Sequence, residues 1–295
     1  MRRLAERAGY AVLPQHALAH LQDTVTALQH AVAAPGAVVD YQVLTDHVAK
    51  QRKFELTDPE FFALYERVRP YTMTSIERLY AMHNAVEYVA RAGVSGAIVE
   101  CGVWRGGSMM MAALTLAALG KIDRELILFD TFAGHPRPNP ERDLKDHYEF
   151  WLQRRRTDES SSWAEATLEE VRANLSSTGY PLDRMKLVKG IVQASIPAAA
   201  PEAIALLRLD TDWYDSTAHE MRHLYPRLVP GGVLIVDDYG EMQGQKQAID
   251  EFCQQNGVVL LLNRIDSSGR IAVKSVDLQD RPPSVIAGTE LGAAG

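Results

Sequence analysis

From residue 74 onward, short apolar runs alternate with longer segments in which apolar residues recur at helical spacing. The apolar runs predict strands at 97–101, 126–129, 185–188, 205–209, 233–236, 258–262 and 270–273. The helical spacing predicts helices at 75–92, 108–119, 168–176, 217–228 and 245–256. Such alternation is typical of an α/β fold with a doubly wound, mostly parallel sheet. No helix separates the last two strands, so we expect a hairpin that adds an antiparallel strand at one edge.

Three segments lie outside this alternation. Residues 1–70 lack it, and we expect them to form a helical N-terminal appendage; Asp58 and Pro59 predict a helix over 59–68. Residues 131–162 form a long insertion directly after a strand, which we interpret as a lid, with a solvated insertion as the alternative. We expect 277–295 to be a disordered tail, which leaves 71–276 as the main domain.

Composition restricts the possible partners. The chain has 46% hydrophobic and 23% charged residues, as soluble globular proteins do, and its net charge of −7 argues against a nucleic-acid surface. No apolar run approaches the roughly 18 residues that a membrane span needs. Cys101 and Cys253 are far apart and read as reduced core residues. The basic start is interrupted by polar residues, so we expect a cytoplasmic protein with neither nucleic-acid nor membrane partners.

Two of the predicted strands end in pairs of aspartates. Asp210 and Asp212 follow the strand at 205–209, and Asp237 and Asp238 follow the next one. Residues at the carboxyl ends of parallel strands line the ligand crevice of such sheets. Four carboxylates there would repel one another unless a cation or protons neutralised them, and hard divalent cations favour oxygen ligands. The pattern therefore predicts a metal site, in which a remaining carboxylate could act as general base. The alternative is that these aspartates cap turns or pair internally.

The segment 98–108 predicts a strand, a tight turn and the start of a helix. Gly102 permits the turn, and Gly106 and Gly107 would bring backbone N–H groups and a helix N-terminus close to a ligand. Trp104 and Arg105 stand where a dinucleotide fingerprint needs glycine. The pattern therefore favours a smaller cofactor such as S-adenosyl-L-methionine, with a plain strand–helix turn as the alternative.

Acidic residues also end the first two strands. Glu100 suits a zwitterionic cofactor. Asp130 could accept hydrogen bonds from the ribose hydroxyls of an adenosine group, or it could cap a helix.

Histidines and aromatic residues near these motifs are further candidates. His135 lies in the proposed lid and could touch substrate. His219 and His223 have i, i+4 spacing without an HExxH pattern, so we expect them to pack or to face solvent. Trp213 and Tyr214 could equally pack in the core or stack on a sugar ring.

Five stretches carry a resemblance to a known family. They are 71–75 (YTMTS), 99–108 (VECGVWRGGS), 129–134 (FDTFAG), 209–217 (LDTDWYDST) and 224–240 (LYPRLVPGGVLIVDDYG). Together they resemble the macrocin O-methyltransferase family, whose members use S-adenosylmethionine and Mg²⁺ to methylate hydroxyls of deoxysugars and related glycosides of natural products. The resemblance covers about residues 70–273.

The resemblance implies a Rossmann-like class I methyltransferase fold with a seven-stranded sheet. It also implies that Asp210, Asp237 and Asp238 ligate Mg²⁺ and that Asp212 is the general base. The residues that it implies for the cofactor are Met73, Thr74, Glu100, Gly102, Ser108, Asp130, Gly190 and Ile191. Family members commonly form dimers or larger homo-oligomers, in which N-terminal parts close a neighbour's site.

We therefore expect an O-methyltransferase acting on a sugar hydroxyl of a glycosylated small molecule. One alternative is a metal-dependent O-methyltransferase of a catechol or another phenolic diol. A nicotinamide-dependent oxidoreductase is disfavoured because the GxGxxG motif is absent. A non-catalytic cofactor-binding or assembly protein is a further alternative, and it would show no metal-dependent activity.

Overall fold

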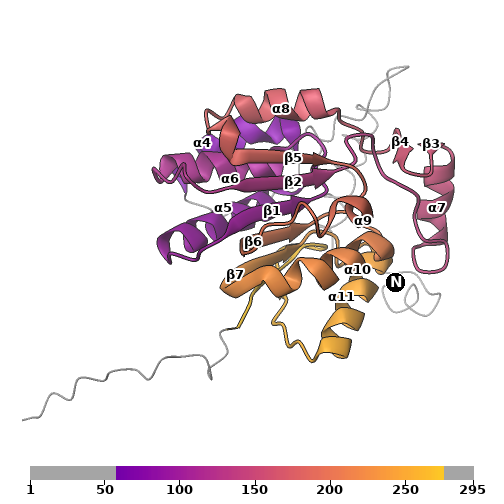
Figure 1. Cartoon of the computed structure of the whole chain (residues 1–295). Coiled ribbons are helices and arrows are strands. Elements are labelled where there is room, and N and C mark those ends of the chain that lie inside the picture. Colours follow the sequence, from indigo (N-terminus) through magenta and orange to yellow (C-terminus); the bar gives the residue numbers. More distant parts are fainter. Residues whose placement is uncertain (1–57, 276–295) are drawn as a thin grey trace, which may run out of the picture.

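The computed structural model describes residues 58–275, so most of the expected appendage and the expected tail lie outside the described part (Figure 1). The strands are β1 (Ala97–Cys101), β2 (Leu126–Asp130), β3 (Arg155–Thr157), β4 (Ser160–Ser161), β5 (Met185–Lys189), β6 (Ile204–Leu209), β7 (Leu228–Val236), β8 (Asn263–Arg264) and β9 (Arg270–Val273). The α-helices are α4 (Pro59–Val68), α5 (Ile76–Arg91), α6 (Gly107–Ala118), α7 (Lys145–Leu152), α8 (Leu168–Ser176), α9 (Val192–Ser195), α10 (Tyr214–His223) and α11 (Gln243–Asn256). Short 3₁₀ turns are η1 (Arg69–Tyr71), η2 (Leu182–Arg184) and η3 (Tyr225–Arg227).

One seven-stranded sheet organises the domain, in the order β5-β2-β1-β6-β7-β9-β8. The first five of these strands are parallel, and β9 runs antiparallel to both of its neighbours. The expected Rossmann-like methyltransferase architecture is therefore confirmed. Helices cover both faces of the sheet, with α4, α5, α6 and α8 on one side and α9, α10 and α11 on the other (Figure 1).

The central strands are apolar because both of their faces are buried. All five residues of β1 are buried, and successive side chains alternate between the two helical layers. Ile98 packs in the layer that contains α5 and α6, whereas Val99 packs against α10 and α11. Cys101 is buried in this second layer and Cys253 is partly buried, and both are free thiols. Within residues 58–275, no helix is long and apolar enough to cross a membrane.

Two predicted elements differ from the structure at the carboxyl side of the domain. The hairpin forms, but 258–262 is not a strand, and the edge strand β8 contains only Asn263 and Arg264. The N–H of Asn263 donates to the carbonyl of Leu261 at 3.0 Å, and this local turn takes the chain out of the ladder. The helix predicted over 217–228 instead starts at Tyr214 and ends at His223, before the 3₁₀ turn around Pro226.

The first described helix is the one that Asp58 and Pro59 predict. The Asp58 carboxylate accepts a hydrogen bond from the Phe61 N–H at 3.0 Å, which caps α4.

The insertion at 131–162 is folded and lies beyond the carboxyl ends of the parallel strands (Figure 1). It contains α7 and the small β3–β4 hairpin. Trp151 of α7 is completely buried, and its indole N–H donates to the carbonyl of His135 at 3.1 Å. The insertion therefore has a packed interior of its own at the position expected of a lid.

Candidate active site

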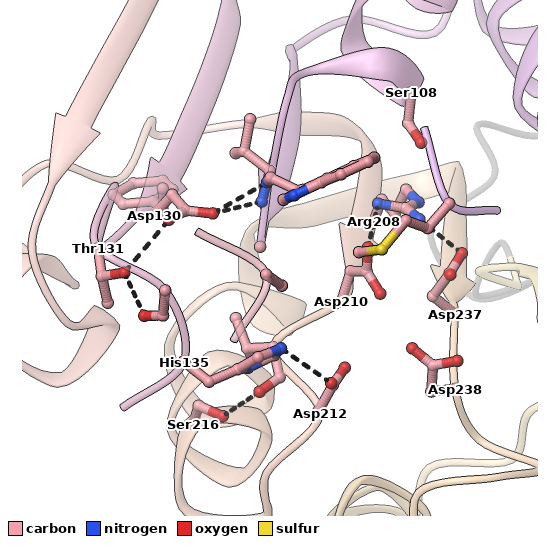
Figure 2. Close-up of a pocket in the computed structure, with 18 of the residues that line it drawn as sticks. Ser108, Asp130, Thr131, His135, Arg208, Asp210, Asp212, Ser216, Asp237 and Asp238 are labelled. Atoms are coloured by element: carbon pink, nitrogen blue, oxygen red, sulfur yellow. Dashed lines mark hydrogen bonds and ion pairs between the residues drawn. The ribbon is translucent and has the colours of Figure 1, made fainter. Parts of the chain in front are cut away.

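A cavity of about 390 Å³ opens at the carboxyl ends of β1, β2, β6 and β7, and the insertion forms one of its walls (Figure 2). Thirteen of the residues proposed from the sequence for the cofactor, metal, base or substrate line it: Met73, Thr74, Gly102, Gly107, Ser108, Asp130, His135, Gly190, Ile191, Asp210, Asp212, Asp237 and Asp238. Residues more than 150 positions apart in the chain therefore share one site, because the parallel strands end along the same edge of the sheet.

Three other candidates make their contacts inside the protein and do not line the cavity. Glu100 is completely buried, and its carboxylate lies 2.8 Å from the guanidinium of Arg208. The Trp213 indole donates to the carbonyl of Pro136 at 3.1 Å, and the Tyr214 hydroxyl donates to Glu251 at 2.5 Å. Trp213 is buried and Tyr214 is partly exposed.

Asp210, Asp237 and Asp238 form an acidic cluster. Their carboxylates can present one oxygen each within 4.8 Å of one another. The closeness follows from strand register, because Leu209 of β6 lies beside Val236 of β7 and the aspartates come next. An all-oxygen donor set of this kind fits Mg²⁺ or another hard divalent cation.

Arg208 of β6 forms ion pairs with two members of this cluster. Its Nη1 lies 2.8 Å from both Glu100 Oε1 and Asp210 Oδ2, and its Nη2 lies 2.7 Å from Asp237 Oδ1. Burial alone would lower the pKa of Arg208, but the three carboxylates hold it well above its ordinary value. The desolvation of Glu100 outweighs its pairing with Arg208 and raises the pKa of that carboxyl to about 7.

Arg78 of α5 contacts the same cluster from the side. Its Nη1 lies 2.6 Å from Asp237 Oδ2 and 3.2 Å from Asp238 Oδ1, while its Nε donates to Asp266 Oδ2 at 2.8 Å. Asp266 also accepts the Ser75 hydroxyl at 2.6 Å, which ties the start of α5 to the turn before β9.

Asp212 differs from the other three aspartates in its surroundings. It is buried, its φ of 68° is left-handed, and it does not belong to the group of Asp210, Asp237 and Asp238. Its Oδ2 lies 3.5 Å from Nε2 of His135. Burial, and then the nearby charge of Asp238, raise the pKa of Asp212 well above its ordinary value. A carboxyl with these properties is suited to accepting a proton.

Asp130 holds the turn after β1 in place at the other side of the cavity. Its Oδ2 accepts the N–H groups of Val103 at 2.6 Å and Trp104 at 3.2 Å, and its Oδ1 accepts that of Phe132 at 2.7 Å. Gly102 has φ 82°, and a Cβ there would lie only 1.9 Å from the carbonyl oxygen of Asp210. The two strand ends can approach this closely only because Gly102 has no side chain.

The sequence patterns did not indicate Arg78, Arg208 or Asp266. Arg208 left a signal, because a charged residue inside the apolar run of β6 has to be paired when that strand is buried. No sequence pattern marks Arg78 or Asp266, since Arg78 lies at an ordinary helix start and Asp266 in an ordinary turn.

The macrocin O-methyltransferase (TylF) family pattern matches residues 45–273. The chain belongs to the macrocin O-methyltransferase family. It is therefore a methyltransferase that acts on oxygen, as expected from its motifs.

The relatives with named activities include two from Streptomyces and Micromonospora. The chain is 33% identical over 199 residues to the 8-demethyl-8-(2,3-dimethoxy-α-L-rhamnosyl)-tetracenomycin-C 4′-O-methyltransferase of Streptomyces olivaceus, covering 68% of this chain and 74% of that one. It is 32% identical over 200 residues to the mycinamicin III 3″-O-methyltransferase of Micromonospora griseorubida, covering 68% and 76%. Among solved structures, the O-methyltransferase NovP superposes with a TM-score of 0.65 at 29% identity, covering 80% of this chain and 96% of NovP.

Proposed function

We propose that this O-methyltransferase uses S-adenosylmethionine and Mg²⁺ to methylate a hydroxyl on the sugar of a glycosylated natural product. The observation that carries the proposal is that one cavity joins a cluster of three carboxylates, a separate carboxyl and the turn after β1. The sugar acceptor is supported by the two named relatives, whose activities are directed at a rhamnosyl tetracenomycin and at mycinamicin III.

Asp210, Asp237 and Asp238 would hold the metal. When bound, S-adenosylmethionine supplies a methyl group on a positively charged sulfur, and Mg²⁺ supplies positive charge that lowers the pKa of an acceptor hydroxyl. Arg78 and Arg208 fix the orientation of these carboxylates through their ion pairs. The donor atoms are thus preorganised by contacts within the protein.

Asp212 would take the proton from the acceptor hydroxyl as the new O–CH₃ bond forms and the S–CH₃ bond breaks. Asp130, Gly102 and the N-terminus of α6 at Ser108 would shape the cofactor side of the cavity. Because the chain carries no nucleophile in this step, its contribution is to orient the two reactants and to accept the proton.

The substitution Asp212→Asn tests the assignment of the base. It keeps the size of the side chain and removes its ability to accept a proton, so turnover should fall by about 10²- to 10⁴-fold. Calorimetry should show unchanged binding of S-adenosylmethionine. Wild-type turnover in the variant would overturn the role of Asp212. Asp215→Asn, three residues further along the chain and hydrogen-bonded to Asn139, is the matched control.

A phenolic acceptor is the second candidate, because Trp163 and Pro136 give the cavity an apolar wall beside His135. Assays of glycosylated metabolites against catechols under identical metal and cofactor concentrations distinguish the two. Preference for catechols by kcat/KM would replace the sugar assignment while leaving the reaction class intact.

A further inference from the structure

His135 occupies a position that the proposed reaction has not used. Its ring projects from the insertion into the cavity and its Nε2 points at Asp212, 3.5 Å from the Oδ2 atom (Figure 2). Its side chain is only 15% exposed. Burial, and then the charge of the nearby His147, lower the pKa of His135 to about 4, so at neutral pH the ring is neutral and carries one N–H.

Three tryptophans form hydrogen bonds with the backbone of His135 and Pro136. Its N–H donates to the carbonyl of Trp163 at 3.0 Å, and its carbonyl accepts the indole N–H of Trp151 at 3.1 Å. The next carbonyl, of Pro136, accepts the indole N–H of Trp213 at 3.1 Å. Since Trp213 directly follows Asp212, this last bond joins the insertion to the loop that carries the proposed base.

The imidazole packs against two indole rings that also contact each other. Its centroid lies 4.8 Å from that of Trp163 and 5.2 Å from that of Trp213. The contacts with both indoles and the hydrogen bonds of the backbone restrict the rotation of the ring. The position of Nε2 beside Asp212 is therefore built into the fold of the insertion.

Asp212 stands apart from the acidic cluster. It is buried and does not belong to the group of Asp210, Asp237 and Asp238. Arg78 and Arg208 form their ion pairs with other carboxylates of the site. Among residues 58–275, the contact of Asp212 with a basic side chain is the one with His135.

We propose that His135 is a positioning residue for the general base: its Nε2–H is directed at Oδ2 of Asp212 and keeps that carboxylate facing the acceptor, apart from the group of Asp210, Asp237 and Asp238. The role rests on the proposed function, because it presupposes that Asp212 takes the proton. The indole N–H groups of Trp151 and Trp213 fix the backbone of residues 135 and 136 through hydrogen bonds, and this backbone sets the direction of the imidazole.

A matched pair of variants tests the role. Gln and Met have equal length, but only the Gln amide can place an N–H donor where Nε2 of His135 lies. His135→Met should lower kcat by about 10- to 100-fold, because it removes the N–H that faces the Asp212 carboxylate. The KM of the acceptor and the Kd of S-adenosylmethionine should stay within about threefold. His135→Gln should recover most of the lost kcat, and His223→Met on α10 serves as the control at a distant histidine.

Equal kcat values for His135→Met and the wild type would overturn the role, and so would equal losses in the Met and Gln variants. A second measurement does not depend on the variants folding. Nitrogen-15 NMR of the wild-type protein should show His135 as the neutral Nε2–H tautomer, whereas an Nδ1–H tautomer would overturn the proposal. The base assignment is tested separately: if Asp212→Asn is fully active, the proposed function is wrong; if it is inactive while His135→Met is normal, only the role of His135 is wrong.

Discussion

Glu220 of α10 should make the stability of the protein fall as the pH rises, and Glu220→Gln should remove this dependence. The Glu220 side chain is completely buried behind the loop that carries Asp210 and Asp212. Its Oε1 accepts the hydroxyl of Thr211 at 2.8 Å, but burial prevails and raises the pKa of Glu220 from 4.5 to about 8.

The sign and size of the effect follow from proton linkage. Between about pH 4.5 and pH 8 the folded chain keeps a proton on Glu220 that the unfolded chain has lost. The free energy of unfolding therefore decreases by about 1.4 kcal/mol for each pH unit in this window. From about pH 5.5 to pH 8, Glu220→Gln should gain ~3 kcal/mol relative to the wild type, because an amide does not titrate. The Gln carbonyl can still accept the Thr211 hydroxyl, so the loop keeps its support.

Urea unfolding of both proteins at a series of pH values measures this difference. Subtracting the two curves cancels the titration of all other groups that the variants share. Glu169→Gln, at an exposed position of α8, makes the same change of side chain at the surface and is the matched control. If the difference between Glu220→Gln and the wild type does not vary with pH, Glu220 is ionised in the folded state and the reasoning fails.

Three further perturbations address the metal cluster and the turn after β1. Asp266→Asn should weaken Mn²⁺ binding by about 10- to 100-fold, because Arg78 loses the negative charge that pairs with it and orients it; titration followed by electron paramagnetic resonance measures this, and unchanged affinity would contradict it. Gly102→Ala should destabilise the fold by ~3 kcal/mol or more in urea unfolding, since its Cβ would overlap the carbonyl of Asp210; a loss under ~1 kcal/mol would show that the strand ends can separate. A chelator should abolish turnover and added Mg²⁺ should restore it, whereas activity that survives complete chelation would exclude a metal-dependent reaction.

The order of elements in the main domain could be predicted because its strands are buried on both faces. A fully buried strand such as β1 has to be continuously apolar, and this leaves a clear signal between amphipathic helices. The segment 258–262 carried a similar apolar signal without becoming a strand. Val259 is 88% exposed and Leu261 is 78% exposed, so apolar composition alone did not establish pairing there.

The aspartates of the site could be predicted because strand ends are positions with a known direction in the fold. Trp213 and Tyr214 were harder, because their sequence neighbourhood placed them beside the acidic motif but did not reveal which way they point. Trp213 turns away to bond Pro136, a residue 77 positions earlier in the chain. Long-range partners of this kind, like those of Arg78, depend on how the insertion and α5 pack, which no local pattern records.

The ion pairs of Arg78 and Arg208 leave lone pairs of the aspartate oxygens available to a cation. Each oxygen of Asp237 has one guanidinium partner, Arg208 at Oδ1 and Arg78 at Oδ2. A carboxylate oxygen has two lone pairs, so each can accept one arginine and still coordinate a metal. The carboxylate of Asp266, whose pKa is lowered to about 2, pairs with Arg78 and offsets part of the positive charge of the arginines. The negative charge of the acidic cluster is thus oriented by the arginines without being cancelled, which is the condition that a divalent cation requires of its ligands.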